Sequence, residues 1–205
     1  MNTIDFLKFD SSFILSLWGL NIFIVENLIS FISLFVVTGM YFLIRHHNKK
    51  VSSSLIRDEL TGAYNRRFLE KFDLRGCSVI MVDIDYFKDI NDTHGHPFGD
   101  FVLQELVSFL KGEVREADKI VRLGGEEFCV ILPEAKHSLA RKISERIRER
   151  IERRTFSDGE VECNFTVSLG FLEVEKENHF QEIYERLDGA LYEAKKNGRN
   201  ICVQA

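Results

Sequence analysis

The feature that most constrains this sequence is an almost wholly apolar stretch from Ser11 to Ile44. Residues 1–44 hold only four charged side chains, Asp5, Lys8, Asp10 and Glu26. A membrane-spanning helix needs roughly 20 apolar residues, so this stretch is too long for one untilted helix and short for two. We therefore expect a transmembrane helix at 23–44, preceded by a short, partly apolar segment at 1–22.

Other interpretations of the apolar stretch are weaker, although a hairpin of two short spans stays open. The acidic residues near the start and the length disfavour a signal peptide, and a soluble core helix would show a polar face that 28–44 lacks. Three cations follow the stretch, Arg45, Lys49 and Lys50. The positive-inside rule then predicts a single-pass protein whose C-terminal part lies in the cytoplasm.

Residues 45–57 are mostly polar and predict a helical linker, after which one globular domain runs from 58 to 205. Within it, short apolar runs alternate with helical stripes. We expect strands at 78–82, 120–123, 128–132, 165–172 and 201–203, and helices at 65–72, 101–110, 135–151 and 180–196. This alternation predicts an α+β or α/β layer with helices packed on a central sheet.

Charge and cysteine usage exclude several classes of function. The net charge of −5 argues against a nucleic-acid binder, because phosphate neutralisation needs a basic surface. The four cysteines are scattered without a CxxC pair, which indicates neither a zinc ribbon nor a disulfide scaffold. We expect them to be reduced and mostly buried.

Acidic residues mark one end of the predicted sheet. The first strand ends in Asp83-Ile84-Asp85, and alternation puts both carboxylates on one face. A glycine turn at 124–127 adds two more, Glu126 and Glu127. If these strands are neighbours, three or four carboxylates converge at one sheet edge and need cations such as Mg²⁺ or Mn²⁺, an arrangement suited to phosphoryl transfer from a nucleotide. From the residues alone, solvated turn acids remain the alternative.

Six ordered motifs make the domain recognisable. They are 58–67 (DELTGAYNRR), 83–92 (DIDYFKDIND), 95–100 (GHPFGD), 122–128 (RLGGEEF), 166–170 (TVSLG) and 190–200 (ALYEAKKNGRN). With these motifs the chain from Asp58 to Asn200 resembles the GGDEF family of diguanylate cyclases, in the GGEEF variant of its signature.

The resemblance implies an α+β fold like the nucleotidyl cyclase and polymerase palm domains, with a central, mainly antiparallel sheet flanked by helices. It implies that two GTP are condensed into cyclic di-GMP with release of two pyrophosphates. Each domain would hold one GTP, so a homodimer is implied, with two Mg²⁺ (or Mn²⁺) ions per active site. The location implied with the expected span is the bacterial inner (cytoplasmic) membrane.

The resemblance also assigns site residues by motif position. The metal ligands would be Asp83, Glu126 and the carbonyl of Ile84. Glu126 or Glu127 would assist deprotonation of the ribose 3′-hydroxyl, with Lys88 stabilising charge on the phosphates. The other GTP contacts would be Asn91, His96 and Asp100 around guanine, Lys195 and Arg199 at the triphosphate, and the glycines Gly124 and Gly125, whose backbone can approach the phosphates.

Arg115 and Asp118 match the family's RxxD inhibitory site, where cyclic di-GMP binds back.

The rival function, from another class, is that of a catalytically silent cyclic di-GMP receptor or membrane scaffold. Silent members usually lose the metal acids or guanine contacts, and this chain keeps all of them. A cyclase for another purine nucleotide is disfavoured by Asp100, which can accept from guanine N1 and N2.

Overall fold

The computed structural model describes residues 16–21, 27–28, 32–43, 45, 56–174 and 180–205. The chain divides into two compact units, Met1–Ser52 and Ser53–Ala205. In the first unit, residues 16–21 and 32–43 are helical. Over the described residues, no helix reaches the length and apolar character that crossing a bilayer requires. The helix expected at 23–44 and the linker at 45–57 both fall partly outside the described residues.

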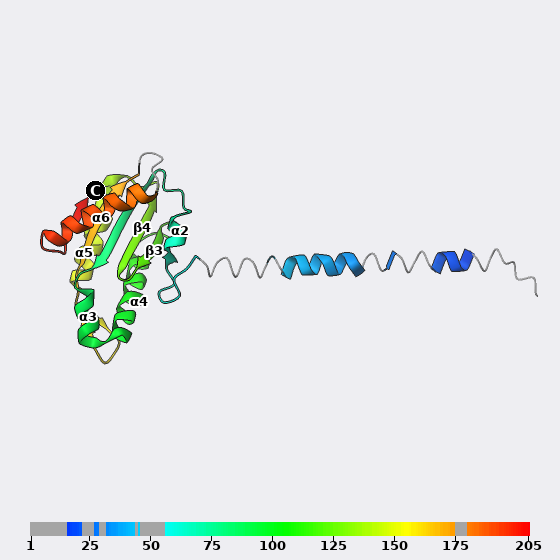
Figure 1. Ribbon diagram of the computed structural model, residues 1–205, viewed down its shortest axis with the longest axis horizontal. Helices are drawn as coiled ribbons and strands as arrows, with labels where there is room; N and C mark the ends of the chain where they lie inside the picture. Colours follow the sequence, from blue (N-terminus) through cyan, green and yellow to red (C-terminus); the bar gives the residue numbers. More distant parts are fainter. Residues whose placement is uncertain (1–15, 22–26, 29–31, 44, 46–55, 175–179) are drawn as a thin grey trace, which may run out of the picture. The chain divides into compact units, whose positions relative to one another are not determined.

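A six-stranded mixed sheet forms the centre of the second unit, with the strand order β1–β3–β4–β2–β7–β8 (Figure 1). The strands are β1 (Tyr64–Asn65), β2 (Cys77–Ile84), β3 (Lys119–Gly124), β4 (Glu127–Pro133), β7 (Val167–Glu173) and β8 (Cys202–Gln204). The four inner strands pair antiparallel, while β1 and β8 pair parallel at the edges. The mainly antiparallel sheet predicted from the resemblance is therefore present, with parallel edges.

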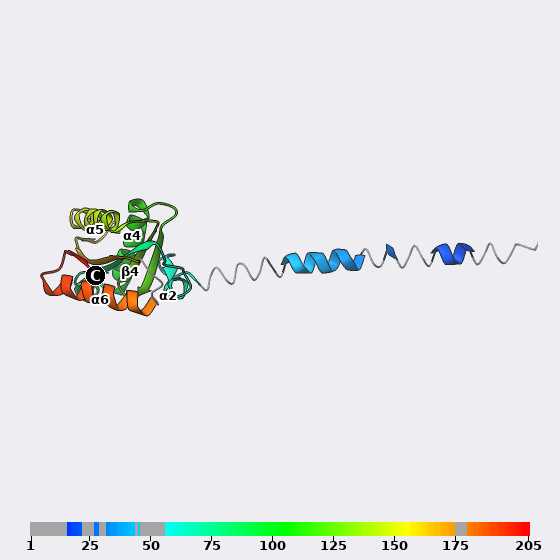
Figure 2. The same cartoon turned by 90° about the horizontal axis from the view of Figure 1, so that it is seen from above.

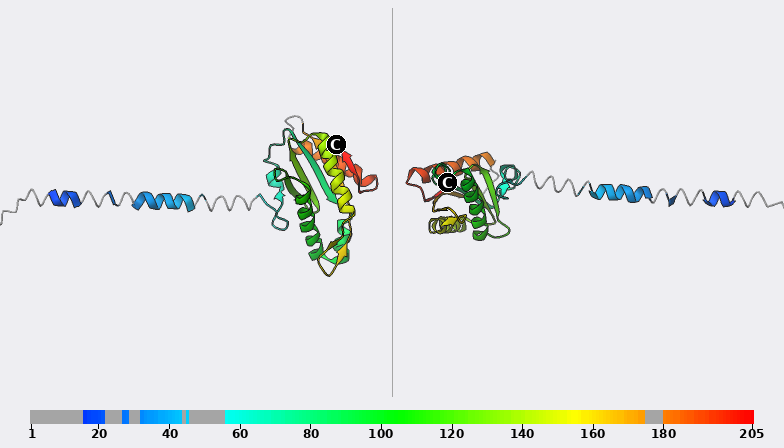
Figure 3. Two further views of the ribbon diagram at one scale, coloured as in Figure 1. Left: turned by 180° about the vertical axis from the view of Figure 1, so that it is seen from behind. Right: turned by 90° about the horizontal axis from the view of Figure 1, so that it is seen from below.

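Helices cover both faces of this sheet. The helices described in this unit are α2 (Arg66–Leu69), α3 (Phe87–His94), α4 (His96–Glu113), α5 (His137–Glu152) and α6 (Phe180–Lys196). Of these, α3 packs mainly on α4 and not on the strands. Figure 2 shows α4 and α5 on one side of the sheet and α6 on the other, and the view from behind in Figure 3 shows α4 and α5 in front of the strands.

Alternation along β2 explains these layers. Ile80 and Val82 belong to the core formed with α4 and α5, whereas Val79 and Met81 belong to the core formed with α6. Successive side chains of a strand point to opposite faces, so an unbroken apolar strand must be covered twice. β2 is buried along its whole length, which places its C-terminal end between two layers.

The predicted helices at 135–151 and 180–196 and the hairpin of β3 and β4 are confirmed within a residue or two. α3 and the first turns of α4 were not predicted from the sequence. α3 is mostly polar, and Gly95, at φ 85°, separates it from a helix that begins just before Pro97. The helix predicted at 65–72 is only the four residues of α2, and β5 (Phe156–Ser157) pairs with β6 (Glu162–Cys163) in a separate small sheet.

Glycine determines how closely α6 approaches the sheet. A Cβ added to Gly170 of β7 would lie 2.8 Å from the carbonyl oxygen of Leu187 in α6. No side chain fits there, so helix and strand pack with their backbones close together. This packing brings the C-terminal end of α6 to the end of β2, where Lys195 meets Asp83.

Candidate active site

The centre of the site is a buried ion pair at the end of β2. Asp83 is 3% exposed, and its Oδ2 lies 2.8 Å from Nζ of Lys195. In the sheet, Asp83 stands opposite Glu127 of β4. Burial raises the pKa of Asp83 to about 6; Lys195 opposes this rise, and the charges of Glu126 and Glu127 add to it. The structure thus brings together three of the four carboxylates that the sequence predicts at one end of the sheet.

The turn between β3 and β4 carries two of these carboxylates. Glu126 and Glu127 are half-buried, and burial raises the pKa of Glu127 further than Lys195 lowers it. Gly125 has φ 50°, a left-handed conformation that favours glycine. A Cβ built on Gly124 or Gly125 would meet nothing within 4 Å, so the space above this turn is open to a ligand.

An arginine absent from the predicted site residues holds this turn. Arg122 donates through Nε and Nη2 to the carbonyl of Gly125, at 3.0 and 2.8 Å, and through Nη1 to Asp58 at 3.0 Å. Burial alone would raise the pKa of Asp58, but hydrogen bonds from Thr61 and Arg122 outweigh it and lower the pKa. Asp58 and Arg122 each lie inside one of the six motifs, so their position in the motifs could have suggested that they belong to the site.

Asp85 does not join the carboxylate cluster, so three carboxylates meet there rather than four. It is 3% exposed, and its two oxygens accept hydrogen bonds from Thr166 Oγ1 at 2.6 Å, Ser168 Oγ at 2.7 Å and the backbone N–H of Asn200 at 3.1 Å. β2 ends at Ile84, one residue earlier. The Asp85 carboxylate is therefore committed to β7 and to the loop after α6.

The predicted guanine contacts lie on α3 and α4. Asn91 is half-buried on α3, and His96 and Asp100 are exposed in the first turns of α4. A Cβ on Gly99 would lie 1.9 Å from Oδ1 of Asn91, so only glycine allows the Asn91 side chain to lie against α4. Gly99 is a further site residue that the sequence analysis did not name, and it places Asn91 next to the residue that precedes Asp100.

The predicted phosphate contacts come from three elements. Lys88 is exposed in the first turn of α3. Lys195 lies in the last turn of α6 beside Asp83, and Arg199 follows in the next loop. The Arg199 guanidinium lies 4.4 Å from the ring centroid of Tyr86, and Nη1 donates to the Tyr86 hydroxyl at 3.3 Å. Two residue pairs, Lys195 with Asp83 and Arg199 with Tyr86, thus join the end of α6 and the loop after it to the end of β2.

The oxygen-rich donor set around Asp83 fits a hard divalent cation. Burial and the neighbouring carboxylates make the ionised form of Asp83 unfavourable unless a positive charge lies beside it. In this structure the Lys195 ammonium supplies that charge. Among the described residues, no three carboxylate, imidazole or thiol side chains are already assembled closely enough to hold an ion. The residues fit a cation that is completed by further ligands, such as a backbone carbonyl and substrate phosphates.

The family model described as "Diguanylate cyclase, GGDEF domain" matches residues 55–201. The chain belongs to the GGDEF family of diguanylate cyclase domains. Cyclases of this family generally use divalent metal ions.

Two curated relatives are cyclases by name. Diguanylate cyclase A of Treponema denticola is 44% identical over 124 residues, which cover 60% of this chain and 33% of that protein. The probable diguanylate cyclase DgcT of Escherichia coli is 40% identical over 159 residues, which cover 72% of this chain and 35% of that protein. The GGDEF chain thus spans about a third of the length of these two relatives.

Two solved structures share the fold. The coiled coil and GGDEF domain of DgcB from Caulobacter crescentus, in complex with c-di-GMP, has a TM-score of 0.73 and 28% identity, covering 82% of this chain and 95% of that one. The diguanylate cyclase SiaD of Pseudomonas aeruginosa, in complex with its activator SiaC, has a TM-score of 0.73 and 31% identity, covering 96% and 80%.

The predicted inhibitory residues of the GGDEF domain lie in one cavity of about 380 Å³. The backbone N–H of Arg115 donates to Oδ2 of Asp118 at 2.8 Å, which closes the RxxD turn. Arg57, Tyr64, Lys111 and Lys119 are among the other lining residues. Only Arg115 and Asp118 were predicted here from the sequence. Lys111 and Lys119 are their near neighbours in the chain, whereas Arg57 and Tyr64 come from a segment about 50 positions earlier.

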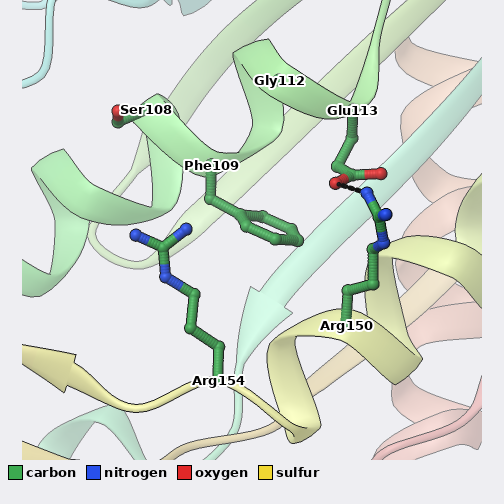
Figure 4. A pocket seen from close by; sticks show the side chains of 6 residues that line it. All are labelled: Ser108, Phe109, Gly112, Glu113, Arg150 and Arg154. Carbon is green, nitrogen blue, oxygen red and sulfur yellow. Dashed lines mark hydrogen bonds and ion pairs between the residues drawn. The ribbon is translucent and has the colours of Figure 1, made fainter.

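A second, open cavity of the GGDEF domain, beside α4 and α5, is lined by residues that form ion pairs (Figure 4). Glu113 accepts from Arg150 Nη1 at 2.6 Å and from Arg146 Nε at 2.9 Å. Arg154 pairs with Glu105 at 3.0 Å, and Figure 4 shows it beside Phe109. The arginines of this cavity are already paired with carboxylates of α4, so these ion pairs hold α5 and the residues after it against α4. We assign no ligand to the cavity.

Proposed function

We propose that this chain is a diguanylate cyclase that condenses two GTP into cyclic di-GMP and two pyrophosphates. The observation that carries the proposal is the convergence of Asp83, Glu126 and Glu127 beside Lys195, in a chain of the GGDEF family. In each of two steps, a ribose 3′-oxygen bonds to the α-phosphorus of the other GTP, and the bond from that phosphorus to the bridging oxygen of pyrophosphate breaks.

The proposed cofactor is Mg²⁺ or Mn²⁺, two ions per active site, held by Asp83, Glu126 and the carbonyl of Ile84. When bound, such cations neutralise the carboxylates and the charge that develops on the transferred phosphoryl group. The buried Asp83 carboxylate supports the proposal, because a neighbouring cation offsets the cost of its ionisation.

The remaining roles follow from the protein's own groups. Glu127 has a raised pKa, which makes its carboxylate a stronger base for the 3′-hydroxyl proton. Lys88, Lys195 and Arg199 are proposed to bind the triphosphate. Asn91, His96 and Asp100 are proposed to bind guanine, with Asp100 accepting from N1 and N2.

Each domain would bind one GTP, so turnover requires two domains that face each other. We propose a homodimer held together at the bacterial inner membrane by the apolar N-terminal segment, with the catalytic domain in the cytoplasm. The apolar stretch from 11 to 44 and the cations after it support this location. Tethering raises the effective concentration of the two domains, up to the millimolar range for short links.

Product inhibition at Arg115 and Asp118 is part of the proposal. Their cavity contains several cations and Tyr64, chemistry that suits phosphates and stacked bases. Because the site is distinct from the GTP residues, bound product would act by restraining domain movement rather than by competing for GTP.

The test is the full chain, purified in detergent, incubated with GTP and Mg²⁺, with products resolved by chromatography. We expect cyclic di-GMP and two pyrophosphates per product, and no cyclic product from ATP. The rival function, a silent receptor or scaffold, would bind added cyclic di-GMP without making any from GTP. Glu126→Gln protein is the matched control for contaminating cyclase activity.

A further inference from the structure

The buried carboxylate of Asp85 bonds to two other segments of the domain, residues 166–168 and the loop at Asn200. It accepts from Thr166 before β7, from Ser168 within β7, and from the backbone N–H of Asn200 in the loop between α6 and β8. The Asp85 N–H in turn donates to the carbonyl of Thr166 at 2.9 Å. A carboxylate this deeply buried, with three donors on its two oxygens, has little capacity left for a metal ion.

The loop that Asp85 holds has an unusual backbone. Gly198, Arg199 and Asn200 are consecutive residues with φ of 112°, 62° and 51°. Side chains with a Cβ rarely adopt this left-handed conformation, which persists only where the surroundings impose it. Besides the bond to Asp85, the side chain of Asn200 donates to Glu152 at 2.8 Å and accepts from Arg148 at 3.2 Å.

The bond between Asp85 and Asn200 has a consequence for their chain neighbours. Tyr86 follows Asp85 and Arg199 precedes Asn200, so joining one pair brings the other pair side by side. The Arg199 guanidinium accordingly lies over the Tyr86 ring and donates to its hydroxyl. The direction of Arg199 thus depends on a carboxylate that it does not touch.

We propose that Asp85 is a positioning residue that acts through Arg199. It imposes the left-handed turn at 199–200 and so holds the Arg199 guanidinium where the substrate's triphosphate is to bind. This inference rests on the proposed function for the role of Arg199, but the Asp85–Asn200 contact itself does not.

Two substitutions of Asp85 separate this role from metal binding. In Asp85→Asn, the amide oxygen can keep the bonds from Asn200 and Thr166, while the amide nitrogen donates to the Ser168 hydroxyl. Asp85→Ala removes all three acceptor contacts. We expect Asp85→Asn to keep kcat/KM for GTP within about threefold of wild type, and Asp85→Ala to lower it about tenfold through a higher KM. Loss of activity in Asp85→Asn as severe as in Asp83→Asn would identify a metal ligand and overturn the proposal.

A kinetic double-mutant cycle tests whether the effect passes through Arg199. Once Arg199→Ala has removed the guanidinium, adding Asp85→Ala should lower kcat/KM by less than about twofold more. Independent, multiplying losses would refute the coupling. Ser78→Ala is the matched control, because it removes a buried hydrogen bond, to the carbonyl of Ala135, at the other end of β2.

Hydrogen exchange of the full chain gives a readout that needs no cyclase activity. Asp85→Ala should speed exchange in peptides covering 196–201 at least about tenfold more than Ser78→Ala does, and Asp85→Asn should leave it near the wild-type rate. Uniformly faster exchange across the domain would show that Asp85 serves core stability alone, against the proposal. If wild type makes no cyclic di-GMP, the proposed function fails, and the exchange result still decides whether Asp85 imposes this turn.

Discussion

Ionised Asp83 should make the cation-free domain less stable than a neutral side chain would. Asp83→Asn replaces the buried carboxylate by an amide of nearly the same size. The ordinary pKa of 3.8 applies to the unfolded chain, and burial raises the pKa to about 6 in the folded domain. At about 1.4 kcal/mol per pKa unit, this difference corresponds to about 3 kcal/mol.

The sign follows from proton binding. Below pH 3.8 both states hold the proton, and Asp83 costs nothing. Between pH 3.8 and 6 the unfolded chain releases it while the folded domain keeps it, so the free energy of unfolding falls as pH rises. Above pH 6 both states are ionised, and the free energy of unfolding falls no further on account of Asp83. Relative to wild type, Asp83→Asn should therefore gain stability, from about 0.5 kcal/mol at pH 4 to about 3 kcal/mol at pH 7.5.

The assay is urea unfolding of both proteins in EDTA at several pH values, because the difference between them cancels groups that titrate alike. Added Mg²⁺ should then stabilise wild type, by about 2.7 kcal/mol at 100 times its dissociation constant, and leave Asp83→Asn unchanged. Asp73→Asn is a control for which the stability change should have the opposite sign. Arg75 lowers the pKa of the exposed Asp73 to about 2, so this substitution should reduce stability as pH rises above that value. A stability difference at Asp83 that does not vary with pH, or a variant less stable than wild type at pH 7.5, would refute the reasoning.

Three other substitutions test the site. Glu126→Gln should lower turnover at least about 100-fold, as when a group that stabilises transition-state charge is removed, and near-normal rates would refute its role. Arg115→Ala should keep turnover but lose inhibition by added cyclic di-GMP in initial-rate assays; unchanged inhibition would make the RxxD pair structural only. Gly99→Ala should displace the Asn91 side chain and raise KM for GTP about tenfold, at a roughly constant melting temperature; an unchanged KM would separate Asn91 from guanine binding.

The sequence by itself determined the features that depend on near neighbours. The hairpin of β3 and β4 follows from two apolar runs around Gly124 and Gly125, and α6 follows from a helical stripe that ends before Gly198. The motifs also located the carboxylates that meet at the end of β2. Such features are readable because strand and helix periods, and glycine turns, act over a few residues.

Only the tertiary structure decided which partner each buried polar group takes. Asp83 and Asp85 look equivalent in the sequence, yet one pairs with Lys195 and the other with β7 and Asn200. The partners Arg122 and Asp58 are 64 positions apart. These choices depend on β2 lying between β4 and β7 and on α6 packing closely at Gly170. A buried charged group must be paired or hydrogen-bonded, and its partner can come from any part of the chain that the fold places beside it. A local sequence pattern therefore does not identify that partner.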